Sequence, residues 1–362
     1  MAVVWTSGTT GHPKGAVYDH DNLAAVALGA GDLSTPEDIR LSPLPFAHVG
    51  YMTRPWDELM NAITTVIVPS PWKAADALRL IEDERVTVAQ GVPTQWRLML
   101  SLPQMDGADL RSLRLVGTGA SNVPPELVRE MRSRLGVPVV VGYTSTEAAI
   151  TTRSRIGDAD EDVARTVGGP SDGVEVKVTD EEGAALGPGE VGGVRCRSAA
   201  TMRGYWRDPE LTARVLSPEG WLSTGDLGYL DERGYLTLVG RQTEMYIRGG
   251  YNVYPAEVEA VLSEHPLVGQ AAVVGVGNKV LGEVGVAFVT GASAPSAAIP
   301  PPAQVDAAVA MAPKQVDAAA VHPQADQLRE WCRDRLADYK APDEIYLVGA
   351  LPLTTMSKVD KT

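Results

Sequence analysis

Close to the start of the chain, a stretch of glycines, hydroxyl side chains and one lysine has the composition of an anion-binding loop. It follows the apolar run Ala2–Trp5 and has the sequence Thr6-Ser7-Gly8-Thr9-Thr10-Gly11-His12-Pro13-Lys14-Gly15. Glycines let a backbone approach an anion closely, hydroxyls donate to phosphate oxygens, and a lysine adds a positive charge. A Walker A loop would have Ser or Thr after the lysine, where this chain has Gly15. The stretch therefore predicts a phosphate loop of another kind, with a plain surface turn as the alternative.

A second polar group, Gly142-Tyr143-Thr144-Ser145-Thr146-Glu147, comes directly after the apolar run Val137–Val141. Such a run predicts a buried parallel strand, and ligands bind beyond the carboxyl ends of parallel strands. Tyr143 could stack on a base, Thr146 could donate to a phosphate, and Glu147 could hold Mg²⁺. The loop Gly117–Ser121 follows the neighbouring strand and could face the same ligand. Each segment is also compatible with an ordinary turn.

Three further segments carry groups that suit a nucleotide. In Ser223-Thr224-Gly225-Asp226, a carboxylate held by a tight turn could accept from two ribose hydroxyls, although Gly-Asp is also common turn chemistry. Arg241 precedes a second basic and Gly-rich segment, Arg248-Gly249-Gly250. Lys358 lies near the end of the chain, where a lysine is ordinarily a solvated charge.

The elements between these motifs predict an α/β fold with a parallel sheet. The clearest unit has a strand at Leu113–Val116, a helix opened by Pro124-Pro125 and closed by Gly136, and a strand at Val137–Val141. A strand at Ile63–Val68, a helix at Ala74–Glu84 and a strand at Val86–Ala89 are also expected, and Asp21 is expected to cap an earlier helix. Between Gly168 and Val239, short strands separated by Gly, Asp and Pro turns predict an antiparallel barrel or meander.

We expect a domain boundary near Gly240–Thr243, which gives a large domain at 1–240 and a smaller one at 241–362. The elements expected in the smaller, α+β domain are a helix at Pro255–Ser263, strands at Gln270–Val276 and Val284–Thr290, a helix at Gln327–Ala337 and a strand at Ile345–Val348. Residues 291–325 are rich in Ala and Pro and predict a flexible insertion.

Composition limits the class of protein. The chain has 362 residues, more than one hydrophobic core normally serves, and its 32 basic and 46 acidic residues give a net charge of −14. An acidic chain is a poor general binder of nucleic acid or anionic membranes. Two cysteines, Cys196 and Cys332, cannot form a disulfide framework, which favours a cytoplasmic location. Neither a membrane-spanning run nor a signal peptide is recognisable.

Taken in order, these motifs resemble those of the adenylate-forming superfamily of acyl-CoA synthetases, nonribosomal-peptide adenylation domains and luciferases. The resemblance extends from residue 3 to the last residue. It implies a large domain with a parallel sheet, helices and a small β-barrel-like part, followed by a mobile α+β lid domain. It also implies a two-step reaction, in which a carboxylate and ATP give an acyl-adenylate and pyrophosphate, and a thiol then displaces AMP. The C-terminal domain would rotate about a hinge between the steps.

The resemblance also implies roles for individual residues. The pyrophosphate portion of ATP would lie on Thr6, Ser7, Gly8, Thr9, Thr10, Gly11 and Lys14. The adenine and acyl pocket would be bordered by Gly119, Ala120, Ser121 and Tyr143. Thr146 would bind the α-phosphate, Glu147 the Mg²⁺, and Asp226 with Arg241 the ribose.

Other residues would serve the two chemical steps. Lys358 would bridge the carboxylate and the α-phosphate during adenylation and stabilise the developing charge. Arg248-Gly249-Gly250 would swing in for the second step, its glycines leaving a tunnel for the pantetheine arm of CoA. His48 matches a position that gates carboxylate against thiol, with an ordinary loop histidine as the alternative. Together, Lys14, Arg241, Arg248 and Lys358 would concentrate positive charge at the site.

Departures from the family pattern shape the functional prediction. The chain has only a few residues before the phosphate loop, where the family has a long segment, so we expect an N-terminally truncated acyl-CoA ligase. Thr243 replaces a charged hinge residue, Ser357 a glycine before the catalytic lysine, Thr144 a glycine, and Arg248 a common lysine. We therefore predict an acid–thiol ligase specialised to the thioester half of the reaction, using acyl-AMP from a separate adenylating enzyme, with adenylation weakened or lost.

Alternatives remain open at this point. One is a complete ATP-dependent acyl-CoA synthetase, and a carrier-protein thiol could replace CoA. Another is a non-catalytic protein that binds an acyl-adenylate or serves in assembly. Small residues near the expected pocket, Gly91, Gly117, Gly119 and Ala120, favour a bulky or polycyclic acid.

Overall fold

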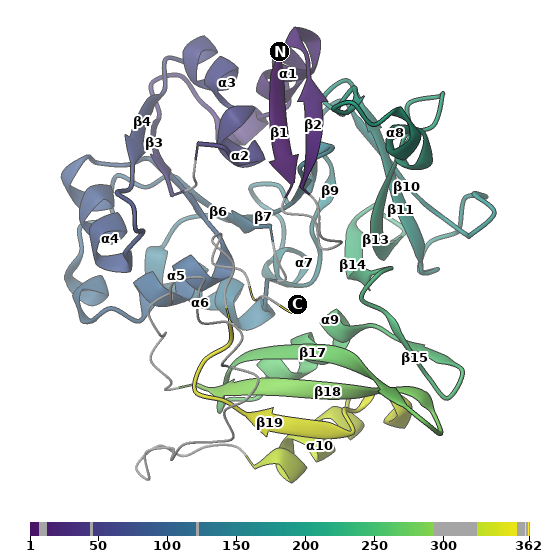
Figure 1. The fold of residues 1–362 in the computed structure, drawn as a ribbon. Helices are drawn as coiled ribbons and strands as arrows, with labels where there is room; N and C mark the ends of the chain where they lie inside the picture. The colour runs from purple at the N-terminus through teal and green to yellow at the C-terminus, as the bar shows by residue number, and fades with distance from the viewer. Residues whose placement is uncertain are drawn as a thin grey trace. The chain divides into compact units, whose positions relative to one another are not determined.

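The computed structural model describes residues 1–6, 13–43, 46–120, 123–292 and 324–352, together with 359 and 361. The chain divides into two compact units, Met1–Val239 and Gly240–Thr362 (Figure 1). Almost all of the Ala/Pro-rich segment 291–325, for which we predicted a flexible insertion, lies outside the described residues.

A seven-stranded sheet in the order β4-β3-β5-β6-β7-β8-β9 forms the centre of the N-terminal unit. The strands from β4 to β7 in this order are parallel, whereas β8 and β9 are antiparallel. Their bounds are β3 (Ile39–Ser42), β4 (Thr64–Ile67), β5 (Val88–Gly91), β6 (Leu115–Gly119), β7 (Val139–Ser145), β8 (Ala149–Arg153) and β9 (Gly169–Pro170). The predicted α/β class with a parallel sheet is confirmed.

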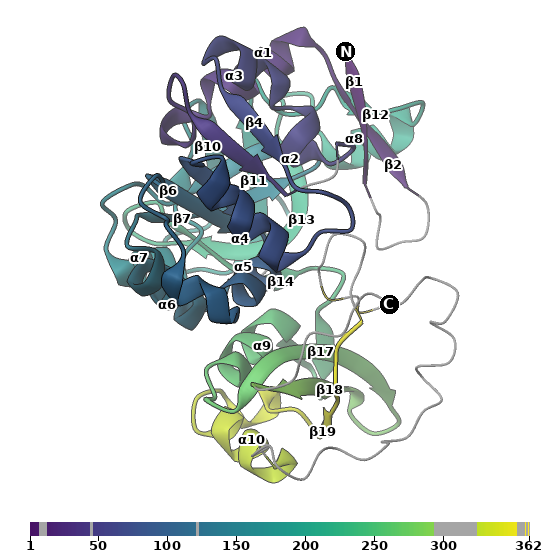
Figure 2. The same ribbon diagram turned by 90° about the vertical axis from the view of Figure 1, so that its left-hand side faces the viewer.

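Helices cover one face of this sheet (Figures 1 and 2). They are α4 (Ala74–Asp83), α5 (Pro93–Leu100), α6 (Pro125–Leu135) and α7 (Asp160–Arg165). Val139 and Val141 point into the core beneath them, while Val140 lies in a separate cluster with Leu33 and Ile150, as the alternation of a strand requires. Gly136 ends α6 in the left-handed conformation, as predicted from its type and position.

A three-stranded sheet, β1-β2-β12, carries the start of the chain. Its bounds are β1 (Ala2–Thr6), β2 (Lys14–Tyr18) and β12 (Gly204–Tyr205), and it is followed along the chain by α1 (His20–Leu28). Short helices η1 (Gly31–Leu33), α2 (Val49–Met52), α3 (Pro55–Met60) and η2 (Pro103–Gly107) occupy connections. The predicted cap of α1 was wrong by two residues. Asp19 is the N-cap because it exchanges reciprocal hydrogen bonds of 3.0 Å with Asn22, and Asp21 lies in the first turn.

The segment predicted as a barrel or meander forms a four-stranded sheet in the order β10-β11-β13-β14. Its strands are β10 (Val174–Thr179), β11 (Gly192–Ser198), β13 (Leu222–Leu230) and β14 (Leu236–Arg241), with α8 (Pro209–Val215) between β11 and β13. The sheet is therefore a meander in which β12, which joins another sheet, and α8 lie between β11 and β13.

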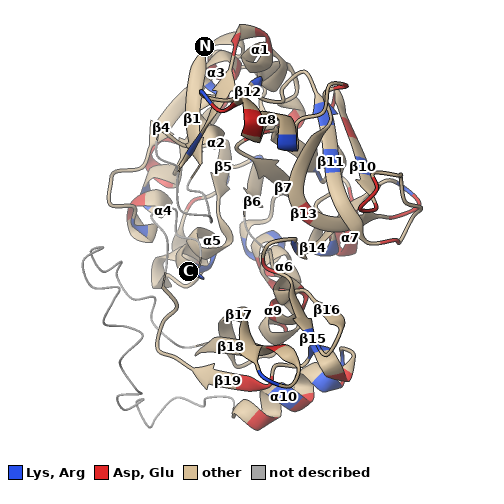
Figure 3. Ribbon diagram, turned by 45° about the vertical axis from the view of Figure 1, so that its right-hand side comes forward, with Lys and Arg blue, Asp and Glu red and all other residues tan. Residues whose placement is uncertain are grey.

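The C-terminal unit is α+β, as predicted. Its sheet has the order β16-β15-β18-β17, and β19 pairs in parallel with β18. The elements are β15 (Tyr246–Arg248), β16 (Tyr251–Val253), α9 (Pro255–Ser263), β17 (Val268–Asn278), β18 (Gly282–Gly291), α10 (Ala325–Arg333), η4 (Asp338–Lys340) and β19 (Glu344–Leu347). Leu262 of α9 and Leu328 of α10 pack on the sheet. Helix α10 carries both acidic and basic residues (Figure 3).

Each unit contains one buried free cysteine, Cys196 on β11 and Cys332 on α10. Burial raises the pKa of the Cys196 thiol to about 12 and that of Cys332 to about 11. Both thiols are therefore protonated at neutral pH. Among the described residues, none of the helices combines the length and the apolarity needed to cross a bilayer.

One carboxylate joins the starts of three neighbouring parallel strands. Asp38, Thr87 and Arg114 each stand one residue before β3, β5 and β6, respectively. Asp38 accepts from Thr87 Oγ1 at 2.7 Å and from Arg114 Nε at 2.8 Å, and a second guanidinium nitrogen also donates to it. Burial alone would raise the pKa of Asp38, but these hydrogen bonds hold it well below its ordinary value.

We expect Asp38→Asn to lower the free energy of unfolding by about 2 kcal/mol at neutral pH, because it weakens charge-assisted hydrogen bonds. A carboxyl group whose pKa is lower in the folded than in the unfolded chain stabilises the folded protein at pH values above the unfolded-chain pKa, which is about 3.9 for Asp. That stabilisation is lost as the pH falls from there toward the folded-state pKa. The difference between wild type and variant should therefore be constant down to about pH 5 and shrink below it. Urea unfolding of wild type and variant at a series of pH values above and below 5 measures this difference in free energy.

Asp109→Asn is the matched control, because Asp109 also pairs with an arginine, Arg111, but on the surface. Its effect should stay near zero at every pH, as is usual for exposed pairs. Equal effects of the two substitutions would contradict the role of Asp38.

Candidate functional site

The candidate site begins with two glycines, Gly119 at the carboxyl end of β6 and Gly142 in the middle of β7. Gly119 and Gly142 are register partners, and a Cβ on Gly119 would lie 2.3 Å from the Gly142 carbonyl oxygen. Only glycine permits this approach. Ala120 follows in a left-handed conformation with φ of +65°. The edge of the sheet therefore presents bare backbone at the position predicted to border a nucleotide.

Tyr143 and Asp226 join the parallel sheet to the antiparallel meander. The Tyr143 hydroxyl donates to Asp226 Oδ2, and Asp226 is only 7% exposed on β13. The Asp226 N–H donates to Thr224 Oγ1 at 3.1 Å, which fixes the turn around Gly225. Burial and then the Asp226 charge raise the pKa of Tyr143 well above its ordinary value. Tyr143 therefore stays protonated and remains a donor to Asp226.

The ring of Tyr143 lies in the hydrophobic core. It packs with Val178, Val194 and Leu236, which come from three strands of the meander. We predicted a ring that could stack on a base, but most of this ring is covered by protein. In the structure the main contribution of Tyr143 is to hold Asp226.

Lys14, Thr146 and Glu147 come from distant motifs and are brought together by two tyrosines. Thr146 and Glu147 occupy the tight turn between β7 and β8. The Tyr205 hydroxyl donates to Glu147 Oε1 at 2.8 Å, and Lys14 Nζ lies 5.8 Å from the centroid of the Tyr205 ring. The Tyr18 hydroxyl donates to the Thr146 carbonyl at 2.6 Å. The end of the phosphate loop and the expected Mg²⁺ ligand thus share one neighbourhood.

Sequence reasoning missed Tyr18 and Tyr205. Burial, followed by the charge of Glu147, raises the pKa of both phenols, so both hold their protons and donate. A signal for Tyr18 was available, because residues 14, 16 and 18 share one face of a strand. The sequence signal for Tyr205 was weaker, because it is only an aromatic residue after a glycine. In the structure that glycine, Gly204, has a φ of +147°.

Several predicted site residues lie outside the described residues. These are Ser7, Gly8, Thr9, Thr10, Gly11, Ser121 and Lys358. Thr6 is described at the end of β1, and its buried Oγ1 has no hydrogen-bond partner among the described residues. An unsatisfied buried hydroxyl at the start of the phosphate loop fits a site that takes an oxyanion.

The acidic groups fit one nucleotide-bound Mg²⁺ better than a dedicated metal cage. No cluster of three or more metal-ligating side chains occurs within the described part of the chain. Mg²⁺ in nucleotide sites typically keeps its waters and uses one or two carboxylates together with phosphates. Glu147, half-buried and held through one oxygen by Tyr205, matches that requirement.

His48 follows the carboxyl end of β3, which is the same edge of the sheet. It caps α2, and its Nδ1 accepts from the Gly50 N–H at 3.0 Å. The adjacent pair Phe46 and Tyr51 stack edge to face with centroids 4.3 Å apart. The histidine ring is therefore oriented by the helix that it caps.

In the C-terminal unit, the segment predicted to enter the site is a tight turn. Gly249 and Gly250, with φ of +58° and +88°, join β15 to β16. Both residues need positive φ in such a hairpin turn. The Gly249 N–H also donates to the Leu281 carbonyl at 2.8 Å. The turn is part of its sheet, so a large movement of it requires movement of the unit.

Arg248 and Arg241 occupy different environments. Arg248 donates to both carboxylate oxygens of Asp343, at 2.8 and 2.6 Å, and this contact raises its pKa. Its charge is thus paired with a carboxylate of the same unit. Arg241 ends β14 and is exposed.

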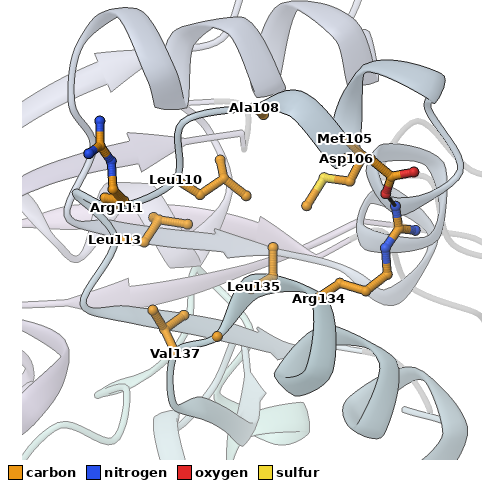
Figure 4. Close-up of a pocket in the computed structure, with 10 residues that line it drawn as sticks. Met105, Asp106, Ala108, Leu110, Arg111, Leu113, Arg134, Leu135 and Val137 are labelled. Carbon is orange, nitrogen blue, oxygen red and sulfur yellow. Dashed lines mark hydrogen bonds and ion pairs between the residues drawn. The ribbon is translucent and has the colours of Figure 1, made fainter.

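A separate hollow of about 600 Å³ lies at the opposite ends of the strands (Figure 4). Leu113 and Val137, which precede β6 and β7, line it. Its arginines are already paired, Arg134 with Asp106 at 2.7 Å and Arg111 with Asp109 at 2.6 Å. The hollow is not part of the candidate site.

Comparison with known proteins supplies the context for this geometry. Residues 1–206 match the family described as AMP-binding enzyme, and residues 257–358 match the AMP-binding enzyme C-terminal domain. An indoleacetate–CoA ligase from Aromatoleum aromaticum is 36% identical, over 100% of this chain and 66% of the relative. A feruloyl-CoA synthase from an Amycolatopsis species is 34% identical, over 99% and 68%.

Solved structures give the same result. ATP-bound MatB from Rhodopseudomonas palustris superposes with a TM-score of 0.85 at 31% identity, covering 99% of this chain and 66% of MatB. The chain spans about two thirds of the length of the curated relatives that it matches, such as the 66% for the indoleacetate–CoA ligase.

The close approach of β6 and β7 predicts a difference between two glycines. Gly119→Ala should lower the free energy of unfolding by about 1–3 kcal/mol, because its Cβ meets backbone. Gly117→Ala should cost less, since its Cβ meets the flexible Gln90 side chain at 3.3 Å. Urea unfolding of both variants tests this, and equal losses would rule out the steric argument.

Proposed function

The chain belongs to the AMP-binding enzyme family, and from this membership we propose that it is an acid–thiol ligase that makes an acyl-CoA through an acyl-adenylate. The observation that carries the proposal is the contact of Tyr205 with both Lys14 and Glu147. It places a cation from the phosphate loop near a carboxylate suited to Mg²⁺, at the edge of the sheet where nucleotides bind.

The nucleotide roles follow the arrangement of the described residues. The loop from Thr6 to Lys14 would hold the pyrophosphate portion of ATP, and the Thr6 hydroxyl, which has no partner within the described ranges, supports this. Thr146 would bind the α-phosphate. The ribose would be held by Asp226 and Arg241, and the adenine would lie along Gly119, Ala120 and Ser121. Mg²⁺ on Glu147 would neutralise phosphate charge.

The reaction would proceed in two displacements. A carboxylate oxygen of the substrate attacks the α-phosphorus of ATP, and the bond to pyrophosphate breaks. The thiol of CoA then loses its proton and attacks the acyl carbonyl, and the bond to AMP breaks. Lys358 would stabilise charge in the first step, and His48 would separate entry of the acid from entry of the thiol.

An aromatic or otherwise bulky acid is the proposed substrate class. Gly91 and Gly119 end β5 and β6 and carry no side chain of their own, whereas the Trp96 and Gln90 side chains lie beside Gly91 and Gly117. Relatives named for indoleacetate and ferulate act on acids of this kind.

A narrower function is a second candidate. Thr243 and Ser357 depart from the family pattern at the hinge and beside the catalytic lysine, which favours an enzyme limited to acyl-AMP and CoA. The relatives are named as complete ligases and synthases, which favours the complete reaction. The specialised enzyme would need a separate source of acyl-AMP.

Two reaction mixtures separate these candidates. We expect acyl-CoA from indoleacetate or ferulate with ATP, Mg²⁺ and CoA, and also from the matching synthetic acyl-AMP with CoA, measured by liquid chromatography and mass spectrometry. Acyl-CoA formed in the mixture of acyl-AMP and CoA, but not in the mixture of acid, ATP, Mg²⁺ and CoA, would establish the narrower function. Detection of neither acyl-CoA in the two mixtures nor pyrophosphate release, across a panel that includes aliphatic acids, would leave only a non-catalytic role.

The two half-reactions should also respond to different substitutions. Lys358→Ala should slow pyrophosphate release by about 100-fold or more and spare the reaction of acyl-AMP with CoA, because it removes charge stabilisation from the first step. Gly249→Trp should do the reverse by blocking the path of the pantetheine arm.

Gly249→Ala is the control for the tryptophan variant, since it has the same strain at positive φ but little bulk. If alanine impairs thioester formation as much as tryptophan does, the tunnel assignment is wrong. Rates of both half-reactions for all three variants provide the comparison.

A further inference from the structure

The last described residue of the chain is held by two carboxylates. Lys361 Nζ lies 2.8 Å from Glu259 Oε1 and 2.9 Å from Glu244 Oε2. Glu259 belongs to α9, and Glu244 belongs to the turn after β14, where its N–H donates to the Arg241 carbonyl at 3.1 Å. We call Lys361, Glu259 and Glu244 the tail clamp.

Glu259 makes the tail clamp more than a surface contact. It is 8% exposed, and its Oε1 also accepts from the Val273 N–H of β17 at 2.7 Å. A buried carboxylate requires a charged or hydrogen-bonded partner, so losing Lys361 would leave this one poorly compensated. Burial alone would lower the pKa of Lys361, but the charges of Glu259 and Glu244 raise it. Lys361 is therefore charged at neutral pH.

A second lysine–glutamate pair in the same unit serves as a reference. Lys340 donates to both carboxylate oxygens of Glu257 at 2.7 Å, and its side chain is 19% exposed against 24% for Lys361. Glu257 and Glu259 are both on α9. The two pairs differ in the segment that they hold, because Lys340 belongs to η4 whereas Lys361 comes three residues after Lys358.

The position of Lys361 in the sequence gives the clamp a role in the reaction. It follows Lys358 by three residues, and an extended chain covers about 3.4 Å per residue, so the Cα atoms of the two lysines are at most about 10 Å apart. We propose that Lys361 is a positioning residue, whose contacts with Glu259 and Glu244 hold the C-terminal segment on α9 and at the hinge turn so that Lys358 is presented for adenylation. This rests on the proposed function, in which Lys358 acts in the first step only.

The activity test compares half-reactions. Lys361→Met should slow acid-dependent pyrophosphate release by about 10- to 100-fold, as expected when a catalytic group is misplaced, and leave acyl-AMP plus CoA within about twofold. Lys361→Arg should recover most of the rate. Lys340→Met should affect neither half-reaction selectively.

A second measurement needs no substrate. Glu259→Gln and Glu257→Gln keep the same C-terminal sequence, so carboxypeptidase digestion followed by intact mass compares anchoring of the tail directly. The tail clamp predicts faster release of the last residues in Glu259→Gln than in Glu257→Gln or wild type.

The outcomes distinguish the two proposals. Wild-type protein inactive in both half-reactions overturns the proposed function, and with it the role assigned to Lys361. Active wild type with a Lys361→Met variant that adenylates normally, or that loses both half-reactions equally, overturns only the positioning role. Equal digestion of Glu259→Gln and Glu257→Gln overturns the anchoring itself.

Discussion

Two tyrosine hydroxyls determine how the sheets of the N-terminal unit meet at the candidate site. Asp226 is buried on the meander and Glu147 is half-buried in the turn after β7, and a carboxylate taken out of water requires donors. Tyr143 and Tyr205 provide them, each from a different sheet. The same contacts that satisfy these carboxylates therefore fix the parallel sheet, the meander and the β1-β2-β12 sheet relative to one another. The need of these two carboxylates for hydrogen-bond donors thus contributes both to the packing of the sheets and to the geometry of the site.

The local elements were predictable and the contacts across sheets were not. Pro-Pro and Gly136 punctuate α6, and the apolar run after them gives β7, because these signals act within a few residues. Helix α9 has the bounds expected from its sequence, Pro255–Ser263. By contrast, the Tyr205–Glu147 contact joins residues 58 positions apart, and it depends on β12 pairing with β2. Hydrophobic periodicity carries no information on that pairing. Even the cap of α1 depended on a reciprocal pair, Asp19 and Asn22, rather than on the residue type alone.

Two of the basic residues expected at the site have different partners. Arg248, which precedes the Gly249-Gly250 turn, is paired with Asp343 of the same unit. Lys14 lies against an aromatic ring and near the carboxylate that the ring's hydroxyl holds. In this acidic protein, with a net charge of −14, the groups near the strand ends that suit an anion are local: backbone, the Thr6 hydroxyl, which has no partner among the described residues, and Lys14.

The two buried cysteines make this protein unusually convenient for spectroscopic labelling. Each unit has a single native thiol, and burial raises the pKa of both, to about 12 for Cys196 and about 11 for Cys332. Because the thiolate is the reactive form, maleimide dyes will react slowly with either site at neutral pH. A cysteine introduced on the surface of each unit would therefore accept a donor and an acceptor dye in the otherwise native sequence. Energy transfer between them would follow the separation of the units in real time.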